Sequence, residues 1–496
     1  MNLIIIYGLF LGACVSLLLL LQLILFLKKH TTPLFHRMIV LSLKHVIYPH
    51  LFHRSWIFAP PTPFNLSLQL VYYAVSLVCN LIGVHSVDEF GIRAGNLAIV
   101  NLIPLLSASR LDLVAKLLGL SLHSYLRMHG TVGLTTCIQG LIHVIIYVWR
   151  NRFDISDSVQ LYGLLSIGSF AILIFLTGIR RWFYETFLKA HSGFAILAAI
   201  MLWRHMGMKK VLARLHLLIG LGIFLGTSAL HTMMLLARNV TSRQFGSKAR
   251  IFRGGDIIRV ELSVARPFKV QAGQSIYVWI PRVSFWSHFQ THPFVVVWDK
   301  QDDNGKAPNI SLLIKERGGF TSKLSRHNQK ATFMAWIDGP YGIPLSLGKY
   351  THALMVATGI GIVSLIPCIR EFVEAQKQQP ILGRTILVAW EPDGESDLDW
   401  VKDWMDQLLQ EDKGNYILRF GLYRHPRGSA PETDGQHDRI WNLPVGMDPK
   451  DLGVSAKNTI RDGMREVVRK EMKSDVTLID LPFQPWENPR APKEAV

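Results

Sequence analysis

The chain has 496 residues, of which 49% are hydrophobic and 18% charged, and its formal net charge is +17. This length is too great for one domain, and the apolar excess lies in the first half, where runs reach membrane-spanning length. A large positive charge can indicate nucleic-acid binding, but no basic patch here is interleaved with stacking aromatic residues, so we expect no nucleic-acid partner. Cys14, Cys79, Cys137 and Cys368 form no CxxC pair, which argues against a disulfide framework or a cysteine-ligated metal.

The first apolar run extends over residues 3–27 and ends at Lys28 and Lys29. A cleaved secretory signal has a basic start and an apolar stretch of about 7–15 residues. This run is longer and lacks the basic start. We therefore expect residues 1–66 to form an anchor helix and a cytosolic linker.

Six further apolar runs predict membrane helices, and membrane lipid is therefore an expected partner. They lie at roughly 67–85, 93–109, 126–149, 158–178, 190–208 and 214–236. The second of these is short and contains Pro104. We expect a multi-pass helical domain over residues 67–237. With seven spans and a cytosolic second half, more Lys and Arg fall in the inner loops than in the outer ones, as the positive-inside rule requires.

After Arg238 the hydrophobic pattern changes. Apolar and polar residues alternate over 258–264, the period of a half-buried strand, and short β-rich runs continue to Gly339. From Tyr350 the pattern is strand, glycine turn and helix, followed by strand-like 385–390, helix-like 398–409 and strand-like 416–422. This alternation predicts a parallel sheet. We expect a β domain over 238–345 and an α/β domain over 346–496.

Four histidines in the predicted membrane helices share one spacing. His129 and His143 lie fourteen residues apart in one helix, and His191 and His205 lie fourteen apart in another. At about 100° per residue, this spacing returns a side chain to within about 40° of its starting face, about 21 Å further along the axis. Each helix therefore presents two imidazoles on one face, separated by most of the ~30 Å hydrocarbon thickness.

These two helices are separated by one span, so they run parallel. Histidines at the same level then pair as His129 with His191 near the cytosolic face, and His143 with His205 near the outer face. Two facing imidazoles can ligate a haem iron from both sides and leave no open position, which suits electron transfer. Ordinary buried histidines are the alternative, but ionisable groups at membrane depth are costly and the repeated spacing favours two haems.

Other histidines and basic residues near these helices carry less information. His85, His123, His216 and His231 lack the symmetry and are interpreted as packing or interface residues. Basic clusters flank both ends of the predicted haem wire and can pair with haem propionates. Arg180, Arg181 and Lys189 lie at the inner end, and Arg204, Lys209 and Lys210 at the outer end. The outer cluster could also attract an anionic metal chelate.

These residues, with a series of short motifs, resemble fungal ferric reductases, within the wider family that includes the NADPH oxidases. The resemblance covers about residues 66–424. Besides the four histidines, its carriers are Ile179-Arg180-Arg181, Tyr184-Glu185, His292-Pro293-Phe294, Gly318-Gly319-Phe320-Thr321, Gly339-Pro340-Tyr341-Gly342 and Gly359-Ile360-Gly361. It implies a multi-domain membrane protein, in which an α-helical transmembrane haem bundle precedes a ferredoxin-reductase-like module. That module consists of a β-barrel FAD domain and an α/β NAD(P)-binding domain.

The resemblance also assigns roles to the motifs. His292, Pro293 and Phe294 would lie along the FAD isoalloxazine ring, and Gly318 to Thr321 would approach its pyrophosphate. Two glycines allow backbone N–H groups to come close to phosphate oxygens, and the hydroxyl of Thr321 can donate a further hydrogen bond. Val295 stands where family members usually have Thr. Gly339, Pro340, Tyr341 and Gly342 would join the barrel to the nucleotide domain.

Gly359 and Gly361 form the predicted turn that would receive the pyrophosphate of NADPH at a helix N-terminus. The sequence departs from the family here, because Thr358 replaces the first glycine and Val363-Ser364 replaces Thr-Pro. The late Cys-Gly-Pro has no counterpart around residues 454–459. Phe483 or Trp486 is the candidate aromatic that shields the flavin. We therefore expect NADPH to reduce the flavin slowly compared with a relative that carries the complete motifs.

The sequence thus predicts an NADPH-dependent transmembrane reductase with FAD and two b haems, which reduces an extracellular ferric or cupric chelate. A superoxide-generating NADPH oxidase shares the wire and differs at its outer end. A cytochrome that receives electrons from a partner reductase is the non-enzymatic alternative. Metal uptake favours the plasma membrane, and the vacuolar membrane is the alternative location. An iron permease or oxidase system is a further expected partner.

Overall fold

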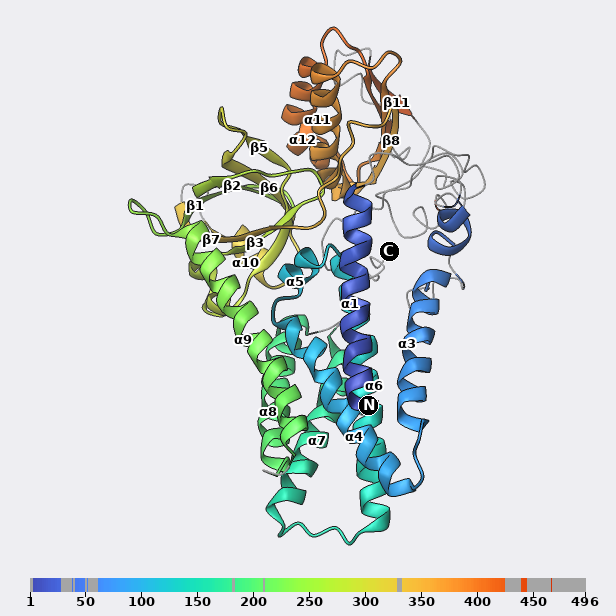
Figure 1. Ribbon diagram of the computed structural model, residues 1–496. Coiled ribbons are helices and arrows are strands. Elements are labelled where there is room, and N and C mark those ends of the chain that lie inside the picture. Colours follow the sequence, from blue (N-terminus) through green and yellow to red (C-terminus); the bar gives the residue numbers. More distant parts are fainter. Residues whose placement is uncertain are drawn as a thin grey trace. The chain divides into compact units, whose positions relative to one another are not determined.

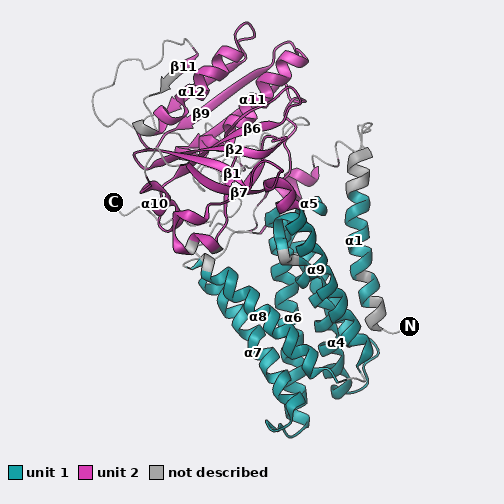
Figure 2. Cartoon of the chain, turned by 90° about the vertical axis from the view of Figure 1, so that its left-hand side faces the viewer, with its two compact units in different colours: residues 1–32, 63–233 teal, residues 33–62, 234–496 magenta. Residues whose placement is uncertain are grey.

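The computed structural model describes residues 3–27, 38, 41–49, 51, 61–180, 183–207, 210–327, 332–423, 439–443 and 465. The chain divides into two compact units (Figure 2), one formed by residues 1–32 and 63–233 and the other by 33–62 and 234–496. The first unit is helical, and all the described strands belong to the second.

Except for the short helix α5, the helices of the first unit overlap the predicted apolar runs (Figure 1). They are α1 (Leu3–Leu27), α3 (Pro63–Leu81), α4 (Val87–Leu106), α5 (Leu111–Leu117), α6 (Leu122–Arg150), α7 (Ser158–Ile179), α8 (Tyr184–His205) and α9 (Val211–Asn239). Six of them, α3, α4, α6, α7, α8 and α9, are long and apolar enough to cross a membrane. The chain is therefore a multi-pass membrane protein. In α1 the apolar segment Tyr7–Leu21 is shorter than these six helices, so a seventh span remains a prediction.

Helix α4 begins six residues before the boundary that hydropathy predicts, at Val87 rather than at residue 93. Ser86 caps this helix by accepting a hydrogen bond from the backbone N–H of Glu89 at 3.2 Å, and Asp88 and Glu89 occupy the first turn. Carboxylates are favourable at a helix N-terminus, but they interrupt the apolar pattern on which the expected boundary depended. Pro104 lies inside the last turn of the helix and does not end it.

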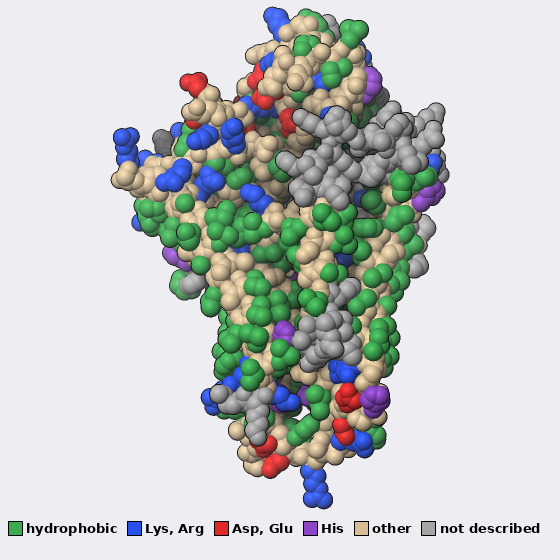
Figure 3. Space-filling view, viewed as in Figure 1, with side chains coloured by type: hydrophobic (Ala, Val, Ile, Leu, Met, Phe, Trp, Pro, Cys, Tyr) green, Lys and Arg blue, Asp and Glu red, His purple; other side chains and the backbone are tan. Residues whose placement is uncertain are grey.

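Much of the helical unit's surface is apolar (Figure 3). On α6 an exposed stripe recurs at helical spacing, with 46% to 57% of each side chain exposed: Leu134, Ile138, Leu141 and Ile145. Such a stripe is what lipid contact requires. Within the unit, α4 packs against α6 and α7 against α8.

A buried polar network ties four of these helices together. The Tyr7 hydroxyl of α1 and the Tyr72 hydroxyl of α3 donate to Asn101 Oδ1 of α4 at 2.8 and 3.1 Å. Asn101 Nδ2 donates to Gln139 Oε1 of α6 at 2.9 Å, and Gln139 donates to Ser76 Oγ at 3.0 Å. Side-chain hydrogen bonds of this kind hold membrane helices together where the hydrophobic effect cannot.

The second unit begins with an antiparallel sheet of seven strands in the order β4-β3-β7-β1-β2-β6-β5, which curls into a half-barrel (Figure 1). The strands are β1 (Ser247–Gly254), β2 (Ile257–Phe268), β3 (Ser275–Trp279), β4 (His292–Val295), β5 (Trp298–Lys300), β6 (Ala307–Lys315) and β7 (Thr332–Tyr341), and a short helix α10 (Phe320–Ser325) follows β6. Inward-facing residues such as Ile258, Val260 and Leu262 form its core.

Parallel strands form the remainder of the second unit, as the βαβ alternation predicts. Each strand of this sheet pairs with the next one along the chain: β8 (His352–Thr358), β9 (Thr385–Glu391), β10 (Leu418–Tyr423) and β11 (Ile440–Leu443). The crossover helices are α11 (Ile362–Gln378) and α12 (Glu395–Glu411).

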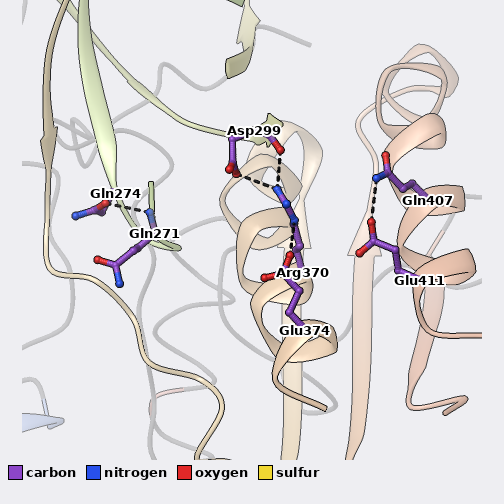
Figure 4. A network of polar contacts seen from close by, with 7 residues as sticks. All are labelled: Gln271, Gln274, Asp299, Arg370, Glu374, Gln407 and Glu411. Carbon is purple, nitrogen blue, oxygen red and sulfur yellow. Dashed lines mark hydrogen bonds and ion pairs between the residues drawn. The ribbon is translucent and has the colours of Figure 1, made fainter. Parts of the chain in front are cut away.

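The half-barrel and the parallel sheet share one hydrophobic core. Trp298 of β5 stacks on Trp404 of α12 with ring centroids 6.3 Å apart. Arg370 of α11 donates to the Asp299 carbonyl at 2.8 Å and to its carboxylate at 2.9 Å, and it also donates to Glu374 (Figure 4). Its guanidinium lies 4.9 Å from the Trp298 ring centre. These contacts join the half-barrel to the parallel sheet within the second unit.

Candidate functional site

The structure brings the four membrane histidines together in two pairs. His129 of α6 faces His191 of α8, and His143 faces His205, with ring centroids 6.3 Å apart in both pairs. We refer to His129 and His191 as the inner pair and to His143 and His205 as the outer pair. These are the partners that the fourteen-residue spacing predicted.

The separation within each pair suits a shared iron. A metal–imidazole bond of about 2.0 Å, as for zinc, and about 1.1 Å from nitrogen to ring centre would place two imidazoles that share one metal ion about 6.2 Å apart. The observed 6.3 Å matches this distance at both levels. The side chains of both pairs are therefore spaced to fit haem.

The two pairs differ in how their Nδ1 atoms are held. In the outer pair, His143 Nδ1 lies 2.9 Å from the Gly91 carbonyl oxygen of α4, and His205 Nδ1 lies 2.8 Å from the Val159 carbonyl oxygen of α7. A carbonyl can only accept, so each Nδ1 is protonated and each Nε2 is left for the metal. In the inner pair, the buried Nδ1 atoms of His129 and His191 have no hydrogen-bond partner among the described residues.

The basic residues expected beside the haems are only partly described. Arg204 donates to the Tyr162 hydroxyl of α7 at 3.1 Å, and its guanidinium lies 5.1 Å from that ring's centre. Arg181 and Lys209 lie outside the described residues. The side chains of Arg180 and Lys210 are exposed to solvent.

In the half-barrel, the two predicted flavin motifs meet through one aromatic contact. The His292 imidazole, on edge strand β4, stacks on the Phe320 ring of α10, with centroids 4.0 Å apart and planes 18° apart. Phe294, two residues further along, is buried in the barrel core, and Pro293 pairs with Tyr277 of β3. Burial lowers the pKa of His292 to about 4, so the imidazole is neutral near pH 7.

The glycine motif after β6 is open, as a phosphate site needs. A β-carbon built on Gly318 or Gly319 would meet no atom within 4 Å, and Gly319 has a φ of +75°. The Thr321 hydroxyl, in contrast, is engaged within the turn. It donates to the Arg317 carbonyl at 2.9 Å and accepts from the Arg317 N–H at 2.8 Å. Its single proton is used there, so the backbone N–H groups remain as the candidate phosphate donors.

Gly339 to Gly342 complete strand β7 and the turn after it. Gly339 and Gly342 have φ values of +127° and +97°, and a β-carbon on Gly342 would lie 3.0 Å from the Gly273 carbonyl oxygen. The Tyr341 hydroxyl donates to Asp338 at 2.6 Å. The motif shapes the end of the barrel just before the chain continues to β8.

The turn after β8 retains the glycine that it needs. Gly359 has a φ of +49°, whereas Thr358 is extended with a φ of −125°. Any residue adopts the latter, so threonine at the first glycine position introduces no backbone strain. The Gly359 carbonyl accepts a 2.8 Å hydrogen bond from the Trp390 indole, and Gly361 leads directly into α11.

An acidic residue that the sequence reasoning missed lies against this turn. The Asp393 carboxylate occupies the space into which a Gly359 β-carbon would project. Lys315 Nζ, at the end of β6, pairs with that carboxylate at 3.0 Å. The signal in the sequence was the acidic segment 391–397 at the end of β9 and the start of α12, where Glu391, Asp393, Glu395 and Asp397 occur without a basic residue. Residues 454–459, Phe483 and Trp486 lie outside the described residues.

These sites define a class: a membrane oxidoreductase in which histidine-paired helices precede a flavin–nucleotide module. Three family models match in the same order. They are a ferric reductase like transmembrane component over residues 94–202, an FAD-binding domain over 245–345 and a ferric reductase NAD binding domain over 350–420. Together they cover more than half of the chain, which belongs to the ferric reductase family.

Curated relatives agree with this assignment. Ferric reductase transmembrane component 3 of Saccharomyces cerevisiae is 27% identical over 54% of this chain and 38% of its own length. The probable cell surface ferric reductase kap2 of Aspergillus oryzae is 21% identical over 79% of this chain and 56% of its own. Respiratory burst oxidase homolog protein B of Solanum tuberosum is 26% identical over 33% and 22%, respectively. The chain thus spans about half or less of each relative.

Proposed function

We propose that this chain is a transmembrane ferric-chelate reductase, which moves electrons from NADPH through FAD and two b haems to Fe(III) or Cu(II) chelates outside the plasma membrane. The observation that carries the proposal is the pair of matched imidazole sites, each with ring centroids 6.3 Å apart. They lie about 21 Å apart along the helices, by fourteen residues of helical rise. Two sites at these levels suit a path across the hydrocarbon layer.

The residues of the second unit would bind and orient the flavin and the nucleotide. When bound, FAD accepts a hydride and passes on single electrons, and haem iron carries electrons one at a time. The neutral His292 ring stacked on Phe320 offers an aromatic wall for the isoalloxazine. The open glycines 318 and 319 leave room for the pyrophosphate, and the Gly359 turn would receive the nucleotide.

Two histidines on each iron leave no coordination position for substrate, so the outer pair would hand electrons to a chelate at the haem edge. Three short connections follow the outer helix ends, over residues 82–86, 151–157 and 206–210. Loops of five to seven residues leave little chain to enclose the outer end. Arg204 and Lys210, with Lys209, place positive charge there, which favours an anionic chelate.

One experiment tests the proposal as a whole. Isolated membranes that contain the chain would be incubated anaerobically with NADPH, and haem absorbance would be followed before and after addition of a ferric chelate. We expect haem reduction first and haem reoxidation with Fe(II) formation afterwards. Membranes with His129→Ala are the control and should form no Fe(II). Haem that stays oxidised under NADPH would contradict the proposal.

A superoxide-generating NADPH oxidase is the second candidate, because the chain also resembles a plant respiratory burst oxidase homologue. The same membranes separate the two activities in air. A reductase should form Fe(II) at a rate that superoxide dismutase leaves unchanged, whereas an oxidase should form superoxide without added metal.

A cytochrome fed by a partner reductase is the third candidate, and the acidic side chain beside the Gly359 turn favours it. It would show FAD that neither NADPH nor NADH reduces.

For a metal reductase that serves metal uptake, an iron permease or oxidase system would be the downstream partner.

A further inference from the structure

Both outer histidines are held in the same way, by a backbone carbonyl and a glycine one turn further along the neighbouring helix. On α4, the Gly91 carbonyl oxygen lies 2.9 Å from His143 Nδ1. Four residues later, a β-carbon on Gly95 would lie 3.0 Å from Cγ and Nδ1 of the same ring. That distance is closer than a methyl group normally approaches an imidazole.

The second outer histidine repeats this arrangement on α7. His205 Nδ1 lies 2.8 Å from the Val159 carbonyl oxygen. A β-carbon on Gly163, again four residues later, would lie 2.7 Å from Nδ1 and 2.8 Å from Cε1 of His205. Two different helices therefore present the same pair of features to the two ligands of one predicted haem.

The four-residue interval has a physical reason. In an α-helix the carbonyl of residue i accepts from the N–H of residue i+4, so the side chain at i+4 flanks that oxygen. Glycine at i+4 leaves the flank open, and the second lone pair of the carbonyl can accept from an imidazole. The inner histidines have no such acceptor among the described residues, so the feature distinguishes the outer site.

We infer that Gly95 and Gly163 are positioning residues that seat the outer haem ligands on the Gly91 and Val159 carbonyls and thereby set the outer haem's midpoint potential. The inference rests on the proposed function, which supplies the haem. An N–H···O bond to the distal nitrogen makes an imidazole a more basic ligand. A more basic ligand stabilises Fe(III), so the seats lower the outer haem's potential and make it a stronger reductant for a metal chelate outside.

Single glycine substitutions test the seats in the full chain. Gly95→Ala or Gly163→Ala should push the imidazole off its carbonyl. Gly168→Ala, also in α7, is the matched control, because a β-carbon there meets nothing within 4 Å. Each purified protein would be titrated potentiometrically by haem absorbance, with haem content and low-spin electron paramagnetic resonance measured on the same samples.

We expect one of two one-electron components to shift upward in each seat variant, by about tenfold in the Fe(III)/Fe(II) equilibrium, or about 59 mV. The other component and the control should be unchanged. Loss of the outer haem alone, with the inner one at its original potential, also supports the seats. Unchanged potentials with two haems in both variants would overturn the inference, as would loss of both haems from both variants. A wild-type protein without bis-histidine haem would instead refute the proposed function.

Discussion

The side-chain amide of Asn239 forms hydrogen bonds with both the backbone N–H and the backbone carbonyl of Ile337. Asn239 Nδ2 donates to the Ile337 carbonyl at 2.8 Å, and Asn239 Oδ1 accepts from the Ile337 N–H at 2.7 Å. Asn239 is completely buried and is the last residue of α9, whereas Ile337 lies in the middle of β7. Both residues belong to the second unit, and we refer to these two hydrogen bonds between Asn239 and strand β7 as the Asn239 clasp.

Asn239→Ala should loosen this clasp. The substitution leaves the N–H and the carbonyl of Ile337 buried without partners, which costs about 2–4 kcal/mol in the free energy of unfolding. We expect a lower melting temperature, followed by flavin fluorescence, and slower haem reduction by NADPH in detergent-purified protein. Gln244→Ala, at a nearby exposed position, is the control. Equal melting temperatures for the Asn239 variant and wild type would show that the clasp contributes nothing.

Substitution of the four membrane histidines tests the ligand assignment. Purified wild type should show a low-spin b-type spectrum with about two haems per chain. Because each haem needs both members of its pair, His129→Ala or His191→Ala should remove the inner haem and His143→Ala or His205→Ala the outer one. His216→Ala, in α9, should retain both. A normal spectrum in any of the four variants would disprove the assignment of that residue.

His292 should make stability depend on pH. Its pKa falls from about 6.5 to about 4 on burial, so between these values the unfolded chain binds a proton that the folded chain does not. Stability is therefore complete above pH 6.5 and declines as the pH falls towards 4, by about 1.4 kcal/mol per pH unit. We expect the melting temperature to drop between pH 6.5 and 5 by more in wild type than in His292→Asn. Parallel curves would show that His292 does not titrate in this way.

The sequence predicted the features that depend on local periodicity. A fourteen-residue spacing was enough to pair His129 with His191 and His143 with His205, because helical geometry relates sequence distance to face and level. Apolar length was enough to locate six membrane helices. The start of α4 was missed because capping residues are polar, and hydropathy does not register them.

Contacts between distant segments were not accessible in this way. The stack of His292 on Phe320 depends on where an edge strand places its first residue relative to a separate short helix. Gly95 and Gly163 have no distinguishing sequence context, since what matters is an imidazole on another helix. At Thr358 the sequence suggested a loss of conformational freedom that the structure does not require. Its extended φ shows that the positive-φ position of the turn is Gly359, which the chain retains.

Sidedness can be tested with single cysteines. Ser156→Cys lies in the exposed connection between α6 and α7, and Gln244→Cys lies in the exposed segment before β1. The topology predicts that a membrane-impermeant thiol reagent labels the first in intact cells and the second only after permeabilisation. Among the native thiols, Cys79 and Cys368 are buried and Cys14 and Cys137 are half-buried, so labelling of the parent chain measures the background. The opposite pattern would reverse both the topology and the direction of electron flow.

The nucleotide site should be weakened by Asp393. Its carboxylate lies against the Gly359 turn and pairs with Lys315 at 3.0 Å, so it brings negative charge to the place where a pyrophosphate would bind. We expect NADPH to reduce the flavin slowly compared with relatives that carry the full glycine and Cys-Gly-Pro motifs. Asp393→Asn removes one like charge at short range, worth about 1 kcal/mol for a fully solvated pair about 4 Å apart, and should lower the NADPH concentration for half-maximal flavin reduction by about three- to tenfold.

Two further variants isolate this electrostatic effect in stopped-flow measurements on the full chain. Lys315→Met leaves Asp393 without its cation and should raise the half-maximal NADPH concentration. Asp403→Asn, where 82% of the side chain is exposed on α12, should change it little. NADH should gain less than NADPH from Asp393→Asn, because it lacks the 2′-phosphate charge. If Asp393→Asn leaves both nucleotides unchanged, the carboxylate does not oppose binding, and the slow step would be attributed to the missing Cys-Gly-Pro contacts with the nicotinamide.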